Sequence, residues 1–157
     1  VVGTRSSLGW SFVAGMLVLV KGMEGLGLTA ALGDAIAKIA GGSTLIAVLA
    51  GTVGVAVGAN LMNNVPAALV AHSAVAGLPS AGAMRAPLTY AAILGADLGP
   101  NVSVAGSLAT MLWLLILRRR GLEVSSLRYL RLGLTITPLA LLAGALAIAG
   151  SLKIVPL

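Results

Sequence analysis

Charged side chains are scarce in this chain, and their scarcity decides the class of protein it can be. Only 9% of the 157 residues are charged and 59% are apolar, with a mean hydropathy of +1.07. Soluble domains carry about 25% charged residues, and apolar runs close to 20 residues long are typical of membrane helices. The composition therefore predicts an all-α polytopic membrane protein.

The basic residues are concentrated in one part of the chain. Five of the seven arginines lie within residues 118–131, between two hydrophobic segments, which is the positive-inside pattern of a cytoplasmic loop. A nucleic-acid site would need basic residues interleaved with aromatics on a soluble face, so the net charge of +6 does not indicate nucleic acid. The chain has no cysteine and a single histidine, His72. We therefore expect neither a metal site nor a cofactor.

The apolar sequence divides into segments of one membrane domain, residues 1–157. Two apolar arms of similar, short length flank the polar stretch ANLMNNVP, which suggests a re-entrant hairpin, and the GPN sequence at 99–101 breaks a later helix. The arginine-rich loop is expected to hold a short interfacial helix, LEVSSLRYL. The expected segments are a transmembrane helix at 10–28, an interfacial helix at 29–40, a re-entrant hairpin at 45–78, a broken transmembrane helix at 86–118, a cytoplasmic loop at 119–129 and a last transmembrane helix at 130–152.

Two spacings within the apolar segments predict contacts. Lys21 and Glu24 lie three residues apart and so on one helical face. They form either a pair that reaches the membrane interface or an intramembrane ion pair on a transport path. Gly54 and Gly58 have the small-xxx-small spacing that brings apolar helices close together.

The two polar breaks resemble each other. Residues 58–65 read GANLMNNV and residues 95–102 read GADLGPNV: five of the eight positions are identical, and a sixth pairs the near-isosteric Asn60 and Asp97. Side chains of this type bond the backbone groups freed where a helix stops, and two facing breaks make a polar pocket in many transporters. The alternative is that the amides cap helix ends at the membrane surface. The residue-based pocket candidates are Asn60, Asn63, Asn64, Asn101, Ser103 and Ser107.

Asp97 is the only carboxylate in residues 41–118. Burial disfavours the charged form of a carboxyl group, so a lone carboxylate at membrane depth can bind and release a proton. Asp97 is therefore our candidate for proton coupling, and helix capping is the other role open to it.

The breaks and their flanks resemble a known family. LMNNVPAALV (61–70), GADLGPNVSVAGSLATMLWL (95–114) and the arginine-bearing loop are similar to the C-terminal half of the arsenite/antimonite efflux permeases, the arsenical pump membrane proteins of the ion transporter superfamily. The resemblance runs from about Gly9 to Gly150, and its most specific parts are MNNVP and DLGP followed by GSLATMLW. It implies one half of an inverted-repeat transporter, with a re-entrant hairpin and a discontinuous transmembrane helix.

The resemblance also implies which residues form the site. The chain departs from the family pattern at Asn101, where members often carry a basic residue, and at Val104, where they often carry a proline. Carried over by motif, the hairpin tip comprises Asn63, Asn64 and Pro66, and the broken-helix loop comprises Asp97, Gly99, Pro100, Gly106 and Ser107.

The implied function is export of arsenite and antimonite across the inner membrane by a multi-pass antiporter, coupled to protons. Amides and hydroxyls suit a neutral trihydroxide, and the lack of cysteine favours release over trapping. The alternatives are a sodium- or proton-coupled carrier of another oxyanion or dicarboxylate, and a non-transporting packing subunit. The sequence shows no nucleophile–base pair, so we do not expect an enzyme. The expected partners are the lipid bilayer, a missing N-terminal half, a separate cytosolic arsenite-stimulated ATPase and a second copy in a homodimer.

Overall fold

The computed structural model describes residues 3–78 and 82–154, and these contain helices and no strand. The expected all-helical fold is confirmed. In chain order the elements are α1 Gly3–Gly25, α2 Leu28–Ala40, α3 Thr44–Met62, α4 Asn64–Ala76, the 3-10 helix η1 Gly82–Met84, α5 Arg85–Leu98, the 3-10 helices η2 Gly99–Val102 and η3 Val104–Gly106, α6 Leu108–Arg119 and α7 Ser126–Ile154.

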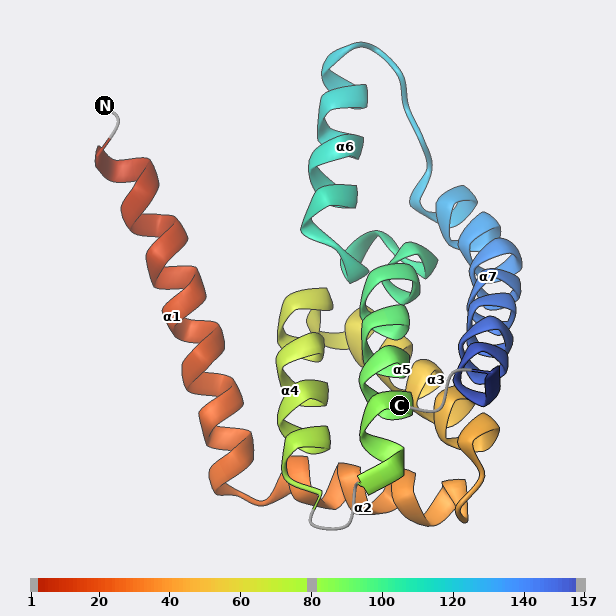
Figure 1. The fold of residues 1–157 in the computed structure, drawn as a ribbon. Coiled ribbons are helices and arrows are strands. Elements are labelled where there is room, and N and C mark those ends of the chain that lie inside the picture. The colour runs from red at the N-terminus through yellow and green to blue at the C-terminus, as the bar shows by residue number, and fades with distance from the viewer. Residues whose placement is uncertain (1–2, 79–81, 155–157) are drawn as a thin grey trace.

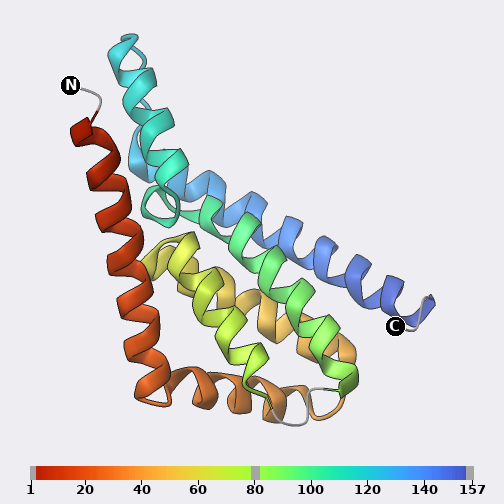
Figure 2. The same ribbon diagram turned by 60° about the vertical axis from the view of Figure 1, so that its left-hand side comes forward.

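The helices run between two ends of the molecule (Figure 1). In this view α1 descends to α2, which lies across the bottom. Helix α3 rises from the α2 end to the middle of the molecule and α4 returns from there, so the two form a hairpin (Figures 1 and 2). Helix α5 rises to the same level, α6 continues upward after a break, and α7 runs back down. The hairpin tip and the helix break therefore lie at similar depth.

Helix lengths differ from the expected segments in two places. Helix α3 continues through Gly58 to Met62, so it is long and apolar enough to cross a membrane, as is Ser126–Lys153 of α7. The short separate helix expected at 122–130 is absent. Residues from Ser126 onward belong to α7, which continues without interruption through Gly133 and Pro138.

Helices α1 and α2 are a bent pair. The axes of Ala14–Gly25 and Leu28–Ala40 make an angle of 66°. Together the two segments are long and apolar enough to form a third candidate span. Gly27 at the bend has a φ of 72°, a conformation that glycine adopts without steric cost. The Lys21 Nζ lies 2.7 Å from the Glu24 Oε2, and the Ser73 hydroxyl of α4 donates to the other Glu24 oxygen. The pair therefore anchors α1 to the hairpin.

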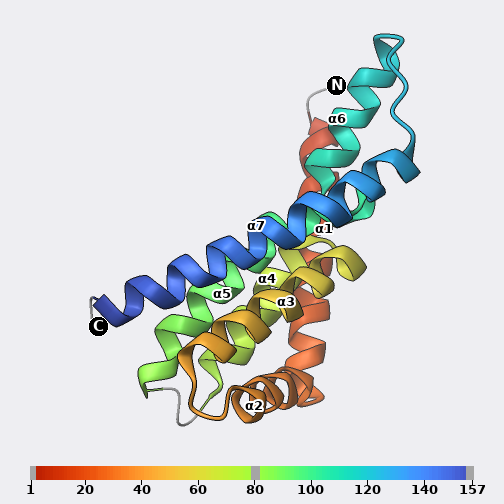
Figure 3. The same ribbon diagram turned by 90° about the vertical axis from the view of Figure 1, so that its right-hand side faces the viewer.

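Helix α3 is the centre of the packing and contacts α2, α4, α5 and α7. Its buried neighbours are small: Val48, Ala91 of α5 and Ala145 of α7 form one core cluster, as expected where membrane helices approach closely. Figure 3 shows α7 lying across this layer. The outward face of α7 carries exposed large apolar side chains such as Leu139, which suit contact with lipid.

The close approach expected at Gly54 and Gly58 occurs elsewhere. A Cβ at Gly54 would meet nothing within 4 Å, and one at Gly58 would touch only the Ala67 Cβ at 3.9 Å. The tight contact involves instead the second glycine pair of the same spacing: a Cβ at Gly95 would lie 2.6 Å from the Thr52 carbonyl oxygen. This contact locks α5 against α3 and so positions the break that follows α5.

Candidate functional site

The hairpin tip and the helix break lie against each other. The tip is the junction of α3 and α4 at Asn63, and the break is the stretch from Gly99 to Ser107 that holds η2 and η3. Helix α3 contacts both η2 and η3, and α7 contacts both from the other side. The structure thus brings together the two polar segments that the sequence singled out.

Asn60 joins these two segments by hydrogen bonds. Its Nδ2 donates to the Ala56 carbonyl at 2.8 Å and to the Gly99 carbonyl at 2.7 Å, and its Oδ1 accepts from the Ser103 backbone N–H at 3.0 Å. A primary amide has two N–H donors, so both are already used. The structure therefore gives Asn60 a positioning role at the expected pocket.

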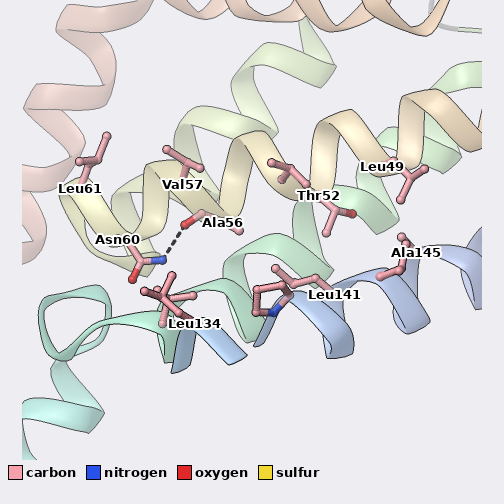
Figure 4. Close-up of a pocket in the computed structure, with 13 residues that line it drawn as sticks. Leu49, Thr52, Ala56, Val57, Asn60, Leu61, Leu134, Leu141 and Ala145 are labelled. Atoms are coloured by element: carbon pink, nitrogen blue, oxygen red, sulfur yellow. Dashed lines mark hydrogen bonds between the residues drawn. The ribbon is translucent and has the colours of Figure 1, made fainter. Parts of the chain in front are cut away.

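Asn60 also borders a separate cavity of about 380 Å³ between α3 and α7 (Figure 4). Apart from Asn60 and Thr52, the cavity is lined by apolar side chains such as Leu134 and Leu141. The Thr52 hydroxyl already donates to the Ala91 carbonyl, at 3.5 Å. The cavity consequently offers few polar groups to a solute, and it is not our candidate site.

Asn63 has an unusual backbone conformation at the tip. Its φ of 78° and ψ of 157° make it the one non-glycine residue with positive φ in the described part of the chain. This region is almost confined to glycine and costs about 1–3 kcal/mol for other residues. The Asn63 Oδ1 atom is also buried and has no hydrogen-bond partner. Strain and an unpaired acceptor therefore coincide at this residue.

Ser103 supplies the second unpaired group. Its hydroxyl oxygen is buried without a partner, while its backbone N–H is held by Asn60. A buried polar atom left unpaired costs about 1–3 kcal/mol, and such atoms in native structures call for an explanation. In the described residues, the Asn63 Oδ1 and the Ser103 Oγ are the two side-chain atoms of this kind. One of these atoms lies at the tip and the other in the break.

Four of the expected site residues shape the backbone. Pro66 is buried in the first turn of α4, where the N–H that proline lacks is not needed, and Pro100 is fully buried in η2. A Cβ at Gly99 would lie 2.5 Å from the Ala56 Cα. At Gly106 it would lie 2.5 Å from the Pro100 carbonyl oxygen and 2.9 Å from the Asn60 Oδ1. These residues allow the two segments to meet.

Other predicted site residues act at helix ends. The Asn101 Nδ2 donates to the Leu98 carbonyl at 3.0 Å, so this exposed amide caps the end of α5. The Ser107 hydroxyl accepts from the Ala109 N–H at 3.2 Å and caps the start of α6. Asn64 is the half-buried first residue of α4. The capping alternative thus describes the contacts of Asn101 and Ser107.

Asp97 lies on a different side of the break. Its side chain is exposed, and within residues 3–78 and 82–154 it makes no hydrogen bond or ion pair. It lines a cavity of about 340 Å³ between α4 and α5, together with His72 and Thr89. From the sequence, His72 is considered only as a metal ligand, for which a single histidine is insufficient. No spacing rule could have paired it with Asp97, because the two residues lie on different helices.

Comparison with known proteins agrees with the resemblance. The family model described as arsenical pump membrane protein matches residues 6–150. Two proteins of that name from Escherichia coli, one of them from strain K12, are 32% and 33% identical to the chain, and one from Yersinia enterocolitica is 33% identical.

Each of these alignments covers 126 residues, which is 80% of this chain and 29% of the relative. The chain therefore spans less than a third of the length of the curated relatives that it matches. No solved structure matches it. The match over residues 6–150 shows that the chain belongs to the arsenical pump membrane protein family.

Proposed function

We propose that this chain lies within one half of an inverted-repeat transporter that exports arsenite and antimonite from the cytoplasm in exchange for protons. The relatives are named arsenical pump membrane proteins and are more than three times as long as the matched region. The facing half of the pocket would come from the N-terminal repeat of the complete protein. That half would place a second pair of helix interruptions opposite Asn63 and Ser103.

The observation that carries this proposal is the pair of unpaired atoms at the junction. The Asn63 Oδ1 is an acceptor, and the Ser103 hydroxyl can accept or donate. Arsenite at neutral pH is an uncharged trihydroxide whose three O–H groups donate hydrogen bonds. An acceptor-only amide oxygen therefore suits arsenite better than an oxyanion, which has few or no protons to donate.

The charge distribution supports the same substrate. The tip and break segments, 58–66 and 95–107, contain no lysine or arginine, so neither segment itself offers a cation to an anionic substrate. Neutral hydrogen-bonding groups also bind weakly enough to release what they carry.

The orientation follows from the arginines. Arg118 and Arg119 end α6 and Arg120 follows them, so these three lie at the end of the molecule opposite α2 (Figure 1). Arg128 and Arg131 lie in the first two turns of α7, after the loop at that end. The positive-inside rule places this end in the cytoplasm. In the inner membrane, the hairpin of α3 and α4 would then rise from the outer side, where α2 lies.

The test uses the complete transporter that contains this chain, expressed in a metalloid-sensitive bacterium. We expect the wild type to lower cellular arsenite, and Asp97→Asn to abolish this at equal membrane expression. Ser103→Ala should weaken arsenite transport about tenfold, since loss of one buried hydrogen bond costs about 1–3 kcal/mol and 1.4 kcal/mol is tenfold.

Ser151→Ala is the matched control, because it removes an exposed α7 hydroxyl that bonds only its own helix. If the wild type leaves cellular arsenite unchanged, the substrate is wrong and other oxyanions should be tried. If both serine variants transport like the wild type, the junction is not the binding site.

A further inference from the structure

The groove between α4 and α5 brings together two titratable side chains. His72 projects into it from α4 and Asp97 from α5, and both are exposed. Thr89 adds a hydroxyl whose proton is donated to the Arg85 carbonyl at 2.8 Å, so its oxygen faces the groove as an acceptor. The remaining lining is small or apolar: Ala68, Val75, Ala92, Ile93 and Ala96. At about 340 Å³ the groove has room for several water molecules.

The groove extends from the break toward the α2 end. Asp97 is the penultimate residue of α5 and so lies beside the break. His72 lies eight residues after the start of α4 at Asn64, which is about 12 Å along a helix that descends from the tip. The two side chains therefore occupy successive depths on one side of the molecule.

The other charged groups around α4 are either paired or do not line the groove. Helix α3 has no titratable residue. From α1, Glu24 is held by Lys21 and by Ser73, the neighbour of His72. The remaining groups are exposed and do not line the groove: Asp34 and Lys38 on α2, and Arg85 and Tyr90 on α5. Asp97 is thus the charged group that shares the groove with His72.

We propose that His72 relays protons between the α2 side of the membrane and Asp97. Imidazole is the side chain that gains and loses a proton between pH 5 and 8 without special surroundings. In the inward step, an imidazolium N–H bond breaks and an O–H bond forms on the Asp97 carboxylate, through water in the groove. The imidazole is left neutral and takes its next proton from the α2 side. This relay rests on the proposed exchange of arsenite for protons.

The experiment uses inside-out vesicles that contain the complete transporter, so that the α2 side faces the lumen. Arsenite uptake is measured with the outer pH and the membrane potential held constant while the lumenal pH is varied from about 5 to about 8. Wild-type uptake should accelerate as the lumen is acidified. His72→Gln should lose this dependence and slow at least about tenfold, since a positioned acid–base group contributes 10²-fold or more and water replaces it only in part.

Two further variants keep the test decisive. His72→Ala leaves space in the groove, so imidazole added to the lumen should restore its rate, a rescue that a merely structural role would not give. Tyr90→Phe is the control, because it alters an exposed α5 side chain outside the groove.

If Asp97→Asn is inactive while the His72 variants keep the wild-type pH profile and gain nothing from imidazole, the relay is wrong and the exchange stands. If Asp97→Asn also transports normally with no pH dependence, proton exchange itself fails and the relay fails with it.

Discussion

Replacing Asn63 by glycine should stabilise the protein and abolish its transport. Glycine adopts a φ of 78° with a ψ of 157° without penalty, so the change relieves about 1–3 kcal/mol of backbone strain. It also removes a buried, unpaired acceptor that costs a further 1–3 kcal/mol or so. Glycine loses about 0.5–1 kcal/mol more chain entropy on folding than other residues. We expect a net gain of about 3 kcal/mol in the free energy of unfolding.

Asn63→Ala separates the two contributions. Alanine also lacks the unpaired Oδ1 but keeps a Cβ at positive φ, so it should gain less stability than glycine by about 1–2 kcal/mol. Both variants should lose arsenite transport to the same degree, because both lack the acceptor. The measurements are the thermal unfolding midpoint of the complete transporter in detergent and arsenite uptake by vesicles.

Two results would refute this reasoning. If Asn63→Gly unfolds at a lower temperature than the wild type, the tip is not strained and its amide contributes to folding. If Asn63→Gly is more stable and still transports at the wild-type rate, the Oδ1 does not bind the substrate.

Two other substitutions test the junction. Asn60→Leu should lower the free energy of unfolding by about 3 kcal/mol, because it leaves the Gly99 carbonyl and the Ser103 N–H unpaired. Leu61→Ala, at the neighbouring exposed position, is its control. An unchanged unfolding midpoint for Asn60→Leu would show that Asn60 does not join the hairpin to the break. Gly106→Ala should lower the free energy of unfolding by about 1–3 kcal/mol through overpacking against Pro100. Gly54→Ala places its Cβ where nothing lies within 4 Å, so it should raise the free energy of unfolding by up to about 1 kcal/mol. Equal unfolding midpoints for the two variants would show that the break can expand to accept the added methyl group.

The sequence predicts the helical fold and the places where polar residues interrupt it, because both follow from local composition. Apolar runs require helices in a bilayer, and the α3–α4 junction does fall at Asn63 and the second break does begin at Gly99. Helix lengths were less predictable. The polar residues of GANLM suggest that α3 ends early, yet Asn60 stays helical, and its side chain bonds the Ala56 carbonyl of the same helix and the Gly99 carbonyl of the break.

Contacts between helices could not be predicted from spacing. The Gly54–Gly58 pair and the Gly95–Gly99 pair look alike in the sequence, and only the tertiary arrangement presents the second pair to a neighbouring helix. Because the sequence does not show these contacts, it gives no ground for distinguishing Asn60 from Asn63 as pocket residues. The structure distinguishes them: every N–H of the Asn60 amide is bonded to backbone, whereas the Asn63 Oδ1 is buried and unpaired.

In the proposed transporter, the junction would separate the groups that hold the backbone from those left for a solute, and also the solute site from the proton site. Asp97 opens on the groove beside α4, whereas Ser103 is held on the α3 side through its own N–H. The segment between them is short and fixed at both ends: the Asn101 amide bonds the end of α5, and Asn60 bonds Gly99 and Ser103.

Under the proposed function, a change in charge at Asp97 would therefore act on one end of a seven-residue segment whose other end carries the buried, unpaired Ser103 hydroxyl. Coupling between two sites requires an element whose arrangement both of them bias. Residues 97–103 connect the two groups, and a shift of the break relative to the hairpin tip would have to break the bonds that Asn60 makes to Gly99 and Ser103.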